Sequence, residues 1–558
     1  MQVEIKISES WQNGGSAEFI IKNISDVPII NWSLDIDFNN FTPTSFNNFS
    51  FTLIRGNTYN IKDPSWSINK NLNAFEEKRD RFQYMTFSDS SSLSANISSY
   101  TSNIVIYPTI NVNEVINTST TQSLTEVIDL NSYKVYGYIP EWGAYEGYNF
   151  KPSNIKFEKL THLMYAFVLA NPSEQDYNLL KSNYNFPPLP YNPPPQTPEG
   201  KIVFHDDWAA NGIPLDMGYN GWINMFKSIK LLYPHLKTIL SIGGWSLSWN
   251  FYILSDPIKR NEFVLSLIDF VKKYNFDGID IDEEFLGVKG PSWDIVKPEV
   301  DVNSFHIMIR ELKSNLLLLI PNKNIEIYCA TGCDPKVLRN YTGLHDVLTG
   351  LSLMTYDYAG SWSNGGHHSG IRHSVFDRNS FQNSEWNVES AVNIALEIGY
   401  KPSQINIGAP FYGRGAKLRN IMIENGEPLP FGENMGTIPT FSTKIGEASV
   451  SSWKDIRDNL NINGLIEYYD SSADASYAMK KLDNGDYEWW SFESPKSIMK
   501  KAEFVKKNKL NGIIIWNLAD DVRDGKNSLL DSLVSVLSLP DIPIQDIPIQ
   551  DIPIQDIP

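Results

Sequence analysis

Phe276-Asp277-Gly278-Ile279-Asp280-Ile281-Asp282-Glu283-Glu284-Phe285 is the stretch of this sequence that decides the fold. Its apolar residues predict a strand, and Asp280, Asp282 and Glu284 follow at a spacing of two. Because side chains alternate along a strand, these three carboxyl groups should share one face, about 6–7 Å apart. Repulsion between them should raise the pKa of at least one. A carboxyl group that keeps its proton near neutral pH can act as a general acid.

The alternatives for this stretch are a solvated acidic turn and a calcium-binding loop. A calcium loop needs glycine and more oxygen ligands, separated by turns. Here Ile279 and Ile281, which suit a buried strand, lie between the acids and should face an apolar layer. The pattern therefore favours a strand whose carboxyl groups take part in catalysis.

Strand-like and helical segments alternate from Tyr133 onward. The clearest helix begins at Asp256-Pro257, a capping residue followed by proline at the first helical position. Strands are predicted at 133–139, 160–168, 237–242, 277–282, 325–330, 350–356, 404–409 and 512–516. Eight strands alternating with helices indicate an α/β fold, a (β/α)8 TIM barrel, whose catalytic residues belong at the C-terminal ends of the strands. The acids fall at that end of the fourth strand.

Composition shifts divide the chain into several predicted parts. Short alternating runs between polar clusters predict an all-β sandwich at the N-terminus. Its Trp11, Trp32 and Trp66 resemble those of bacterial carbohydrate-binding β-sandwich modules, and tryptophans of the core are an equal alternative. The repeated Asp-Ile-Pro-Ile-Gln sequence at the end predicts an extended, disordered tail, because proline blocks both helix and ladder. The predicted parts are the sandwich at 1–125, the barrel at 133–414 and 496–538, an α+β insertion at 415–495, and the tail at 539–558.

Bulk composition excludes some classes of function. A net charge of −18 argues against nucleic acid and anionic membranes as partners. No apolar stretch is long enough to span a membrane, and the start of the chain shows no secretory signal. The two cysteines, Cys329 and Cys333, provide no disulfide framework and are expected to be inert. His367-His368 lacks a third ligand at a zinc-like spacing, so no metal or cofactor is expected.

The stretch from Asp277 to Glu284 resembles the D-G-x-D-x-D-x-E signature of family 18 glycoside hydrolases, the chitinases. Three further segments match motifs of that family, namely Ser241-Ile242-Gly243-Gly244-Trp245, Met354-Thr355-Tyr356-Asp357-Tyr358 and Phe411-Tyr412-Gly413-Arg414. The insertion lies where bacterial-type members carry a small α+β domain that deepens the groove, which favours exo or processive action. One departure is Glu283, at a position where the family usually has tryptophan.

The resemblance implies a role for each matching residue. Glu284 would be the catalytic acid, Asp282 would stabilise the reacting acetamide, and Asp280 would tune Asp282. Tyr356 would hydrogen-bond the acetamide, and Asp277 would only support the strand. The implied substrate-binding residues are Asp357, Met354, Tyr412, Arg414, Trp516, Trp245, Trp142, Phe167 and Trp362. Core packing is an equal alternative for Trp142, Phe167, Trp245 and Trp362.

The implied activity is hydrolysis of the β-1,4 links of chitin by a retaining, substrate-assisted mechanism. The expected partners are chitin and N-acetylglucosamine oligomers. One alternative is a chitin-binding lectin, and another is the chitinase subunit of a larger, toxin-type protein complex. Because no secretory signal is visible, export to the extracellular space by another route is expected, with a cytoplasmic location as the alternative.

Overall fold

The computed structural model describes residues 133–183, 197–290, 301–441 and 447–539, together with nine strands that precede them. The chain divides into two compact units, Met1–Glu126 and Val127–Pro558. Residues 115–132, residues 184–196 and the predicted tail from residue 540 lie outside the described residues.

The first unit is built of β-strands. They form a five-stranded sheet in the order β4-β7-β2-β1-β9 and a four-stranded sheet in the order β5-β6-β3-β8. The strands are β1 (Gln2–Trp11), β2 (Gly14–Lys22), β3 (Ser33–Phe38), β4 (Phe41–Phe46), β5 (Ser50–Arg55), β6 (Thr58–Lys62), β7 (Glu77–Thr86), β8 (Ala95–Thr101) and β9 (Ile110–Glu114). Two sheets agree with the all-β character expected from the sequence, and carbohydrate binding by this unit stays a prediction.

Eight parallel strands of the second unit close into a barrel. Neighbours pair in the order β10-β26-β17-β16-β15-β14-β13-β11, and β10 also pairs with β11. The strands are β10 (Lys134–Pro140), β11 (His162–Ala170), β13 (Lys237–Gly243), β14 (Gly278–Asp282), β15 (Glu326–Gly332), β16 (Gly350–Met354), β17 (Ile405–Pro410) and β26 (Gly512–Trp516). The predicted TIM barrel is therefore confirmed. The short strand β12 (Ile202–Phe204) adds antiparallel to the end of β11.

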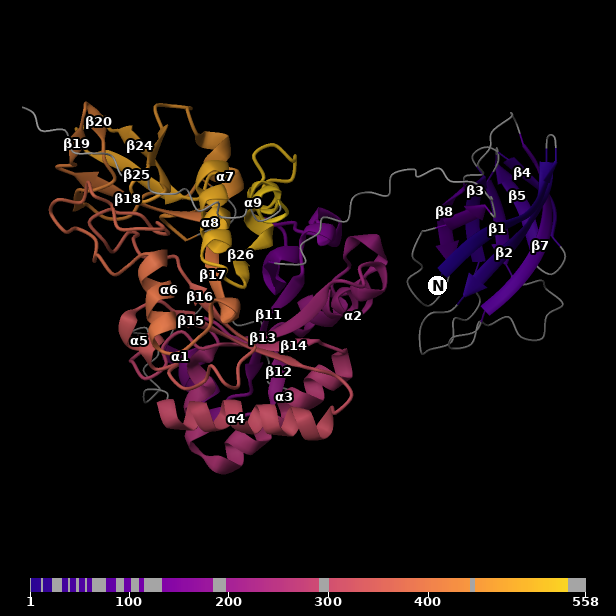
Figure 1. The fold of residues 1–558 in the computed structure, drawn as a ribbon, viewed down its shortest axis with the longest axis horizontal. Coiled ribbons are helices and arrows are strands. Elements are labelled where there is room, and N and C mark those ends of the chain that lie inside the picture. The colour runs from indigo at the N-terminus through magenta and orange to yellow at the C-terminus, as the bar shows by residue number, and fades with distance from the viewer. Residues whose placement is uncertain are drawn as a thin grey trace, which may run out of the picture. The chain divides into compact units, whose positions relative to one another are not determined.

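Helices cover the barrel, as the amphipathic segments predict. In α3 (Pro257–Tyr274) the Asp256 side chain accepts hydrogen bonds from the backbone N–H groups of Ile258 and Lys259, so the predicted cap is present. The other helices around the barrel are α1 (Glu174–Asn183), α2 (Trp222–Leu232), α4 (Val302–Leu319), α5 (Pro335–Arg339), α6 (Val388–Glu397), α8 (Pro495–Lys507) and α9 (Leu529–Leu537). Figure 1 places α3 and α4 on the side of the barrel away from the inserted sheet.

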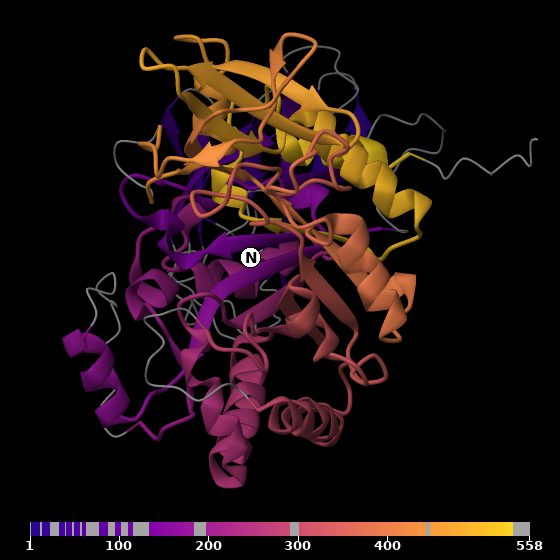
Figure 2. The ribbon, with the colours of Figure 1, turned by 90° about the vertical axis from the view of Figure 1, so that its left-hand side faces the viewer.

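The insertion between β17 and β26 forms a sheet of its own, in the order β21-β18-β25-β24-β23 with β22 beside β18. Figure 2 shows this orange and yellow sheet on one side of the barrel. Its elements are β18 (Tyr412–Arg419), β21 (Glu433–Asn434), β22 (Val450–Ser452), β23 (Ile466–Asp470), β24 (Ala475–Lys481), β25 (Tyr487–Phe492) and the helix α7 (Trp453–Asn459). Tyr412 and Arg414 therefore lie on the first inserted strand, not on barrel strand β17, because the chain pairs with β22 and β25 directly after Pro410.

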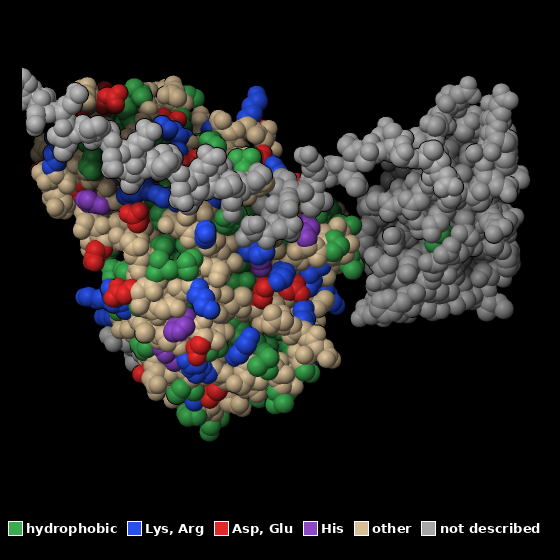
Figure 3. Space-filling model, viewed as in Figure 1, with side chains coloured by type: hydrophobic (Ala, Val, Ile, Leu, Met, Phe, Trp, Pro, Cys, Tyr) green, Lys and Arg blue, Asp and Glu red, His purple; other side chains and the backbone are tan. Residues whose placement is uncertain are grey.

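The surface of the second unit mixes charges of both signs. Figure 3 shows Lys and Arg side chains interspersed with Asp and Glu on one face, with apolar side chains between them. A mixed pattern of this kind is typical of a solvated surface.

Candidate active site

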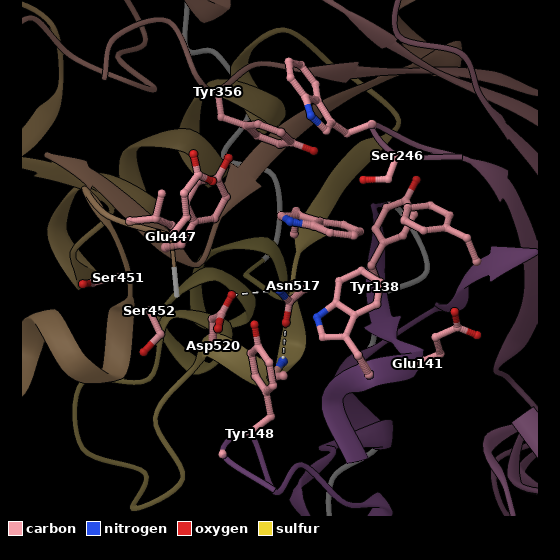
Figure 4. A pocket seen from close by; sticks show the side chains of 18 of the residues that line it. Tyr138, Glu141, Tyr148, Ser246, Tyr356, Glu447, Ser451, Ser452, Asn517 and Asp520 are labelled. Carbon is pink, nitrogen blue, oxygen red and sulfur yellow. Dashed lines mark hydrogen bonds between the residues drawn. The ribbon is translucent and has the colours of Figure 1, made fainter. Parts of the chain in front are cut away.

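A cleft of about 1640 Å³ lies at the C-terminal ends of the barrel strands. The loop after β10 and the ends of β13, β14, β16 and β26 supply part of its lining. The insertion supplies more, including Thr440, Glu447 and residues 450–452. Figure 4 shows side chains from the barrel and from the insertion facing the same space.

All but one of the residues expected at the site line this cleft. They are Asp282, Glu284, Met354, Tyr356, Asp357, Tyr412, Arg414, Trp516, Trp245, Trp142, Phe167 and Trp362. They come from segments up to several hundred residues apart, so the closure of the barrel brings them together. Asp280 is absent from the lining because it is fully buried.

Asp280 is held within the barrel by two hydroxyl groups. The Tyr138 hydroxyl (2.8 Å) and the Ser241 hydroxyl (2.7 Å) both donate to Oδ2 of Asp280. Burial raises the pKa of Asp280 to about 6, although these hydrogen bonds favour its charged form. Its other oxygen, Oδ1, is buried and has no hydrogen-bond partner in the described part of the chain.

Asp282 and Glu284 bring two more carboxyl groups to the end of the same strand. Burial raises the pKa of Asp282, and the charges of Glu284 and Asp280 raise it further. Burial also raises the pKa of Glu284 to about 8, with the charges of Asp357 and Glu283 adding to the effect. The pKa values at this strand are raised as expected, but burial, not repulsion between the acids, is the largest cause. With its pKa near 8, Glu284 keeps its proton at neutral pH.

Glu283 turns away from the cleft. It is 1% exposed and is not part of the lining. Its carboxylate accepts the backbone N–H of Phe285 at 2.8 Å, and its carbonyl oxygen accepts the Tyr341 hydroxyl at 2.8 Å. Glu283 therefore lies behind the cleft wall and forms no part of the cleft lining.

Asp357 also lines the cleft, and two side chains hold its carboxylate. The Tyr412 hydroxyl donates to it at 2.8 Å, and the Arg414 guanidinium donates to both of its oxygens at 2.8 Å. Burial alone would raise the pKa of Asp357, but the Arg414 charge lowers it below its usual range. Asp357 is therefore a permanent negative charge facing the cleft.

Aromatic rings form much of the remaining lining. Phe167 and Trp516 stack with their ring centroids 5.6 Å apart, and Trp142 lies 6.2 Å from Trp516. Trp245 and Trp362 are 55% and 54% exposed, which excludes core packing as their role. Phe167 is 6% exposed. It packs in the barrel core and also lines the cleft, so core packing and substrate contact are compatible for this residue.

A second polar cluster on the cleft wall was not expected from the sequence. Buried Glu141 accepts a hydrogen bond from Tyr165 at 2.8 Å and contacts Nδ1 of His205. Next to it, the Tyr145 hydroxyl donates to Asp206 at 2.5 Å. No motif in the sequence indicates this cluster, because single acids and a histidine in loops resemble ordinary surface residues.

Asp277 supports the strand from outside the cleft, as the sequence suggested. Its carboxylate contacts the ammonium groups of Lys230 and Lys323, both at 2.8 Å, and accepts the backbone N–H of Thr238 at 2.9 Å. Asp277 is absent from the cleft lining. These contacts fix the start of β14.

The two cysteines and the His367-His368 pair considered in the sequence analysis are buried. Cys329 and Cys333 are free thiols, and burial raises the pKa of both, that of Cys333 to about 12. Their thiols stay protonated, which makes them poor nucleophiles. His367 is paired with Asp470 at 3.0 Å, and His368 contacts Asp357 at 3.6 Å.

Metal-binding clusters and membrane-spanning helices are both absent from the described residues. No group of three or more His, Cys, Asp or Glu side chains in the described part of the chain could hold a metal ion. No helix within the described ranges is long and apolar enough to cross a membrane.

Known proteins resemble the barrel unit in sequence and in structure. The sequence profile of glycosyl hydrolases family 18 matches residues 134–521. A chitinase of Autographa californica nuclear polyhedrosis virus is 31% identical over 412 residues, which cover 71% of this chain and 71% of that protein. Chitinase A1 of Niallia circulans is 27% identical over 430 residues, covering 70% and 57% of the two chains. Among solved structures, chitinase ChiA74 of Bacillus thuringiensis aligns with a TM-score of 0.61 and 26% identity, over 75% of this chain and 71% of that one.

Proposed function

The chain belongs to glycosyl hydrolase family 18, and from this premise we propose that it is a chitinase. It hydrolyses the β-1,4 links between N-acetylglucosamine units. The observation that carries this proposal is Glu284, a carboxyl group with its pKa raised to about 8, in a cleft lined by exposed tryptophans. An acid protonated at neutral pH is what the departure of a sugar oxygen needs.

Glu284 is proposed as the general acid and then the general base. It donates its proton to the oxygen of the breaking link, and the sugar's own acetamide oxygen attacks the anomeric carbon. The ionised Glu284 then takes a proton from the water that opens the intermediate. Two displacements at one carbon restore its configuration, so the product keeps the β form.

Asp282 and Tyr356 are proposed to act on the acetamide. The carboxylate of Asp282 would stabilise the positive charge of the oxazolinium intermediate, and the hydroxyl of Tyr356 would hydrogen-bond the acetamide. Asp280 lies behind Asp282, and its charge is one cause of the raised pKa of Asp282. That coupling supports the proposal that Asp280 tunes Asp282.

The rest of the cleft is proposed to bind the sugar chain. Trp516 and Met354 would form the floor at the cleavage point, and Asp357, with Tyr412 and Arg414, would bind polar groups of the neighbouring sugar. The proposed stacking surfaces are Trp142, Phe167, Trp245 and Trp362, since sugar faces pack on aromatic rings. The inserted residues on the wall favour a deep groove and exo or processive action.

The site favours an enzyme over a chitin lectin, because the catalytic acid Glu284 is retained at the cleft. Since chitin is an insoluble polymer, we propose that the protein meets it outside the cell. Association with a larger protein complex stays a proposal without a structural contact to support it.

The central experiment is Glu284→Gln, assayed on soluble N-acetylglucosamine oligomers. The amide keeps the shape but has no acidic proton, so turnover should fall by about 100-fold or more while oligomer binding survives. NMR of the first product formed by the wild type should show the β anomer. An early α product, or retained turnover in Glu284→Gln, would contradict the mechanism.

A further inference from the structure

The backbone of Asp357 has an unusual conformation. Its φ of 61° lies in the left-handed region, which residues other than glycine seldom adopt. Arg414 and Tyr412 hold its carboxylate, but neither holds its backbone. The backbone N–H of Asp357 instead faces Nδ1 of His368, at 3.4 Å.

His368 is itself fixed in place. Its side chain is fully buried, its backbone N–H donates to the Ser491 hydroxyl at 3.0 Å, and its carbonyl accepts the N–H of Tyr358 at 3.1 Å. The next residue, Ser369, donates to the carbonyl of Thr355 at 2.6 Å and is held in turn by buried Lys501. These contacts hold the backbone of His368 in place beside Asp357.

The His368 ring is neutral. Burial lowers its pKa, although Asp357 acts in the opposite direction. Arg414 and Glu493 are the other charged groups that act on it, and the Tyr412 ring lies 5.3 Å away. A neutral imidazole has one nitrogen that accepts and one that donates. Nδ1 lies 3.4 Å from the Asp357 nitrogen and 3.6 Å from its carboxylate. With Nδ1 accepting the nearer N–H, the proton belongs on Nε2, which is buried and has no hydrogen-bond partner among the residues that the structure describes.

Asp357 also acts on Glu284. Its charge follows burial as the next cause of the raised pKa of Glu284. The charge of Glu283 raises the pKa of Glu284 further. The charge of Glu284 in turn raises the pKa values of Asp282 and Tyr356. The position of the Asp357 carboxylate therefore affects how strongly Glu284 holds its proton.

We propose that His368 is a positioning residue: its Nδ1 accepts the Asp357 N–H and fixes Asp357 in the left-handed conformation that keeps its carboxylate in the cleft. This inference rests on the proposed role of Glu284 as the acid. His368 touches neither the substrate nor the reacting atoms in this scheme. Its contribution is to keep the charge that faces Glu284 in one place.

The test compares three substitutions of His368. An asparagine side chain can place an oxygen near the position of Nδ1, whereas glutamine reaches towards the position of Nε2 and leucine has no acceptor. His368→Asn should keep the basic limb of the pH profile of kcat/KM near that of the wild type. His368→Gln and His368→Leu should move that limb to lower pH by about half a unit, because a displaced Asp357 carboxylate raises the pKa of Glu284 less.

Two controls separate positioning from general damage. His367→Leu removes the neighbouring buried contact between His367 and Asp470 and should lower thermal stability without moving the basic limb. Asp357→Asn removes the charge itself and should move the limb to lower pH by about one unit. Equal shifts in His367→Leu and His368→Leu, or no shift in His368→Gln, would overturn the inference.

A readout without turnover keeps the inference separate from the proposed function. The pKa of Glu284, followed by carboxyl 13C NMR, should fall in His368→Gln and stay in His368→Asn, whether or not the protein cuts chitin oligomers. In the wild type, 15N NMR should show the His368 proton on Nε2, and a proton on Nδ1 would overturn the assignment. If the wild type does not cut chitin oligomers but Glu284 and His368 titrate as expected, only the chitinase proposal is contradicted.

Discussion

The pKa of Glu284 sets the pH range in which this residue can act as an acid. Burial and the nearby negative charges raise that pKa to about 8 from the ordinary 4.5. The proton needed by the leaving oxygen is therefore present below pH 8 and lost above it. We expect kcat/KM on soluble N-acetylglucosamine oligomers to fall as pH rises through about 8, in a pH–rate profile. A fall centred near pH 4.5 would show that the pKa of Glu284 is not raised, or that Glu284 is not the general acid.

Glu283 allows a second prediction at the residue scale. Because it faces away from the cleft, Glu283→Trp should change activity by no more than about tenfold, roughly 1.4 kcal/mol in the barrier. Glu283→Gln is the matched control, since it removes the charge and keeps the size. A gain far above tenfold in the tryptophan variant alone would mean that shape at this position limits the native enzyme.

The helix α8 carries a buried ion pair that links the insertion to the barrel. Lys501 contacts Glu493 at 2.6 Å and donates to the carbonyl of Gly408, on β17, at 3.0 Å. Lys501→Met would leave the buried Glu493 without a cationic partner, with only the Ser497 hydroxyl, among the described residues, donating to it. This should reduce the free energy of unfolding by about 3–5 kcal/mol, measured by urea denaturation.

The double variant Lys501→Met/Glu493→Gln is the control for that ion pair. It removes both charges, so it should recover a large part of the lost stability. A double variant as unstable as Lys501→Met would show that packing or the Gly408 contact, not the unpaired charge, accounts for the loss.

The strands were easier to predict than their assignment to domains. Barrel strands such as β26 are short apolar runs bounded by turn signals, which a sequence shows directly. The start of the insertion was harder, because Tyr412 to Arg414 has the local pattern of a barrel strand. Only its pairing with β22 and β25 places it in the inserted sheet.

The first unit provides a test at the scale of the whole molecule. If it binds chitin, deletion of residues 1–125 should lower the rate on insoluble chitin several-fold and leave soluble oligomers hydrolysed at a near-normal rate. The reason is that an accessory module raises the local concentration of enzyme on a surface. Release of soluble sugar from both substrates is the measurement. An equal loss on both would mean that the first unit supports the barrel instead.

The sequence by itself determined the barrel and its acids, because alternating strands and helices and the spacing of Asp280, Asp282 and Glu284 are local patterns. The tertiary structure alone decided how these acids titrate. One of the two hydroxyl groups that hold Asp280 comes from Tyr138, 142 residues away, and Arg414 reaches Asp357 across 57 residues. A pKa depends on burial and on such distant neighbours, and these exist only once the barrel has closed and the insertion has packed beside it.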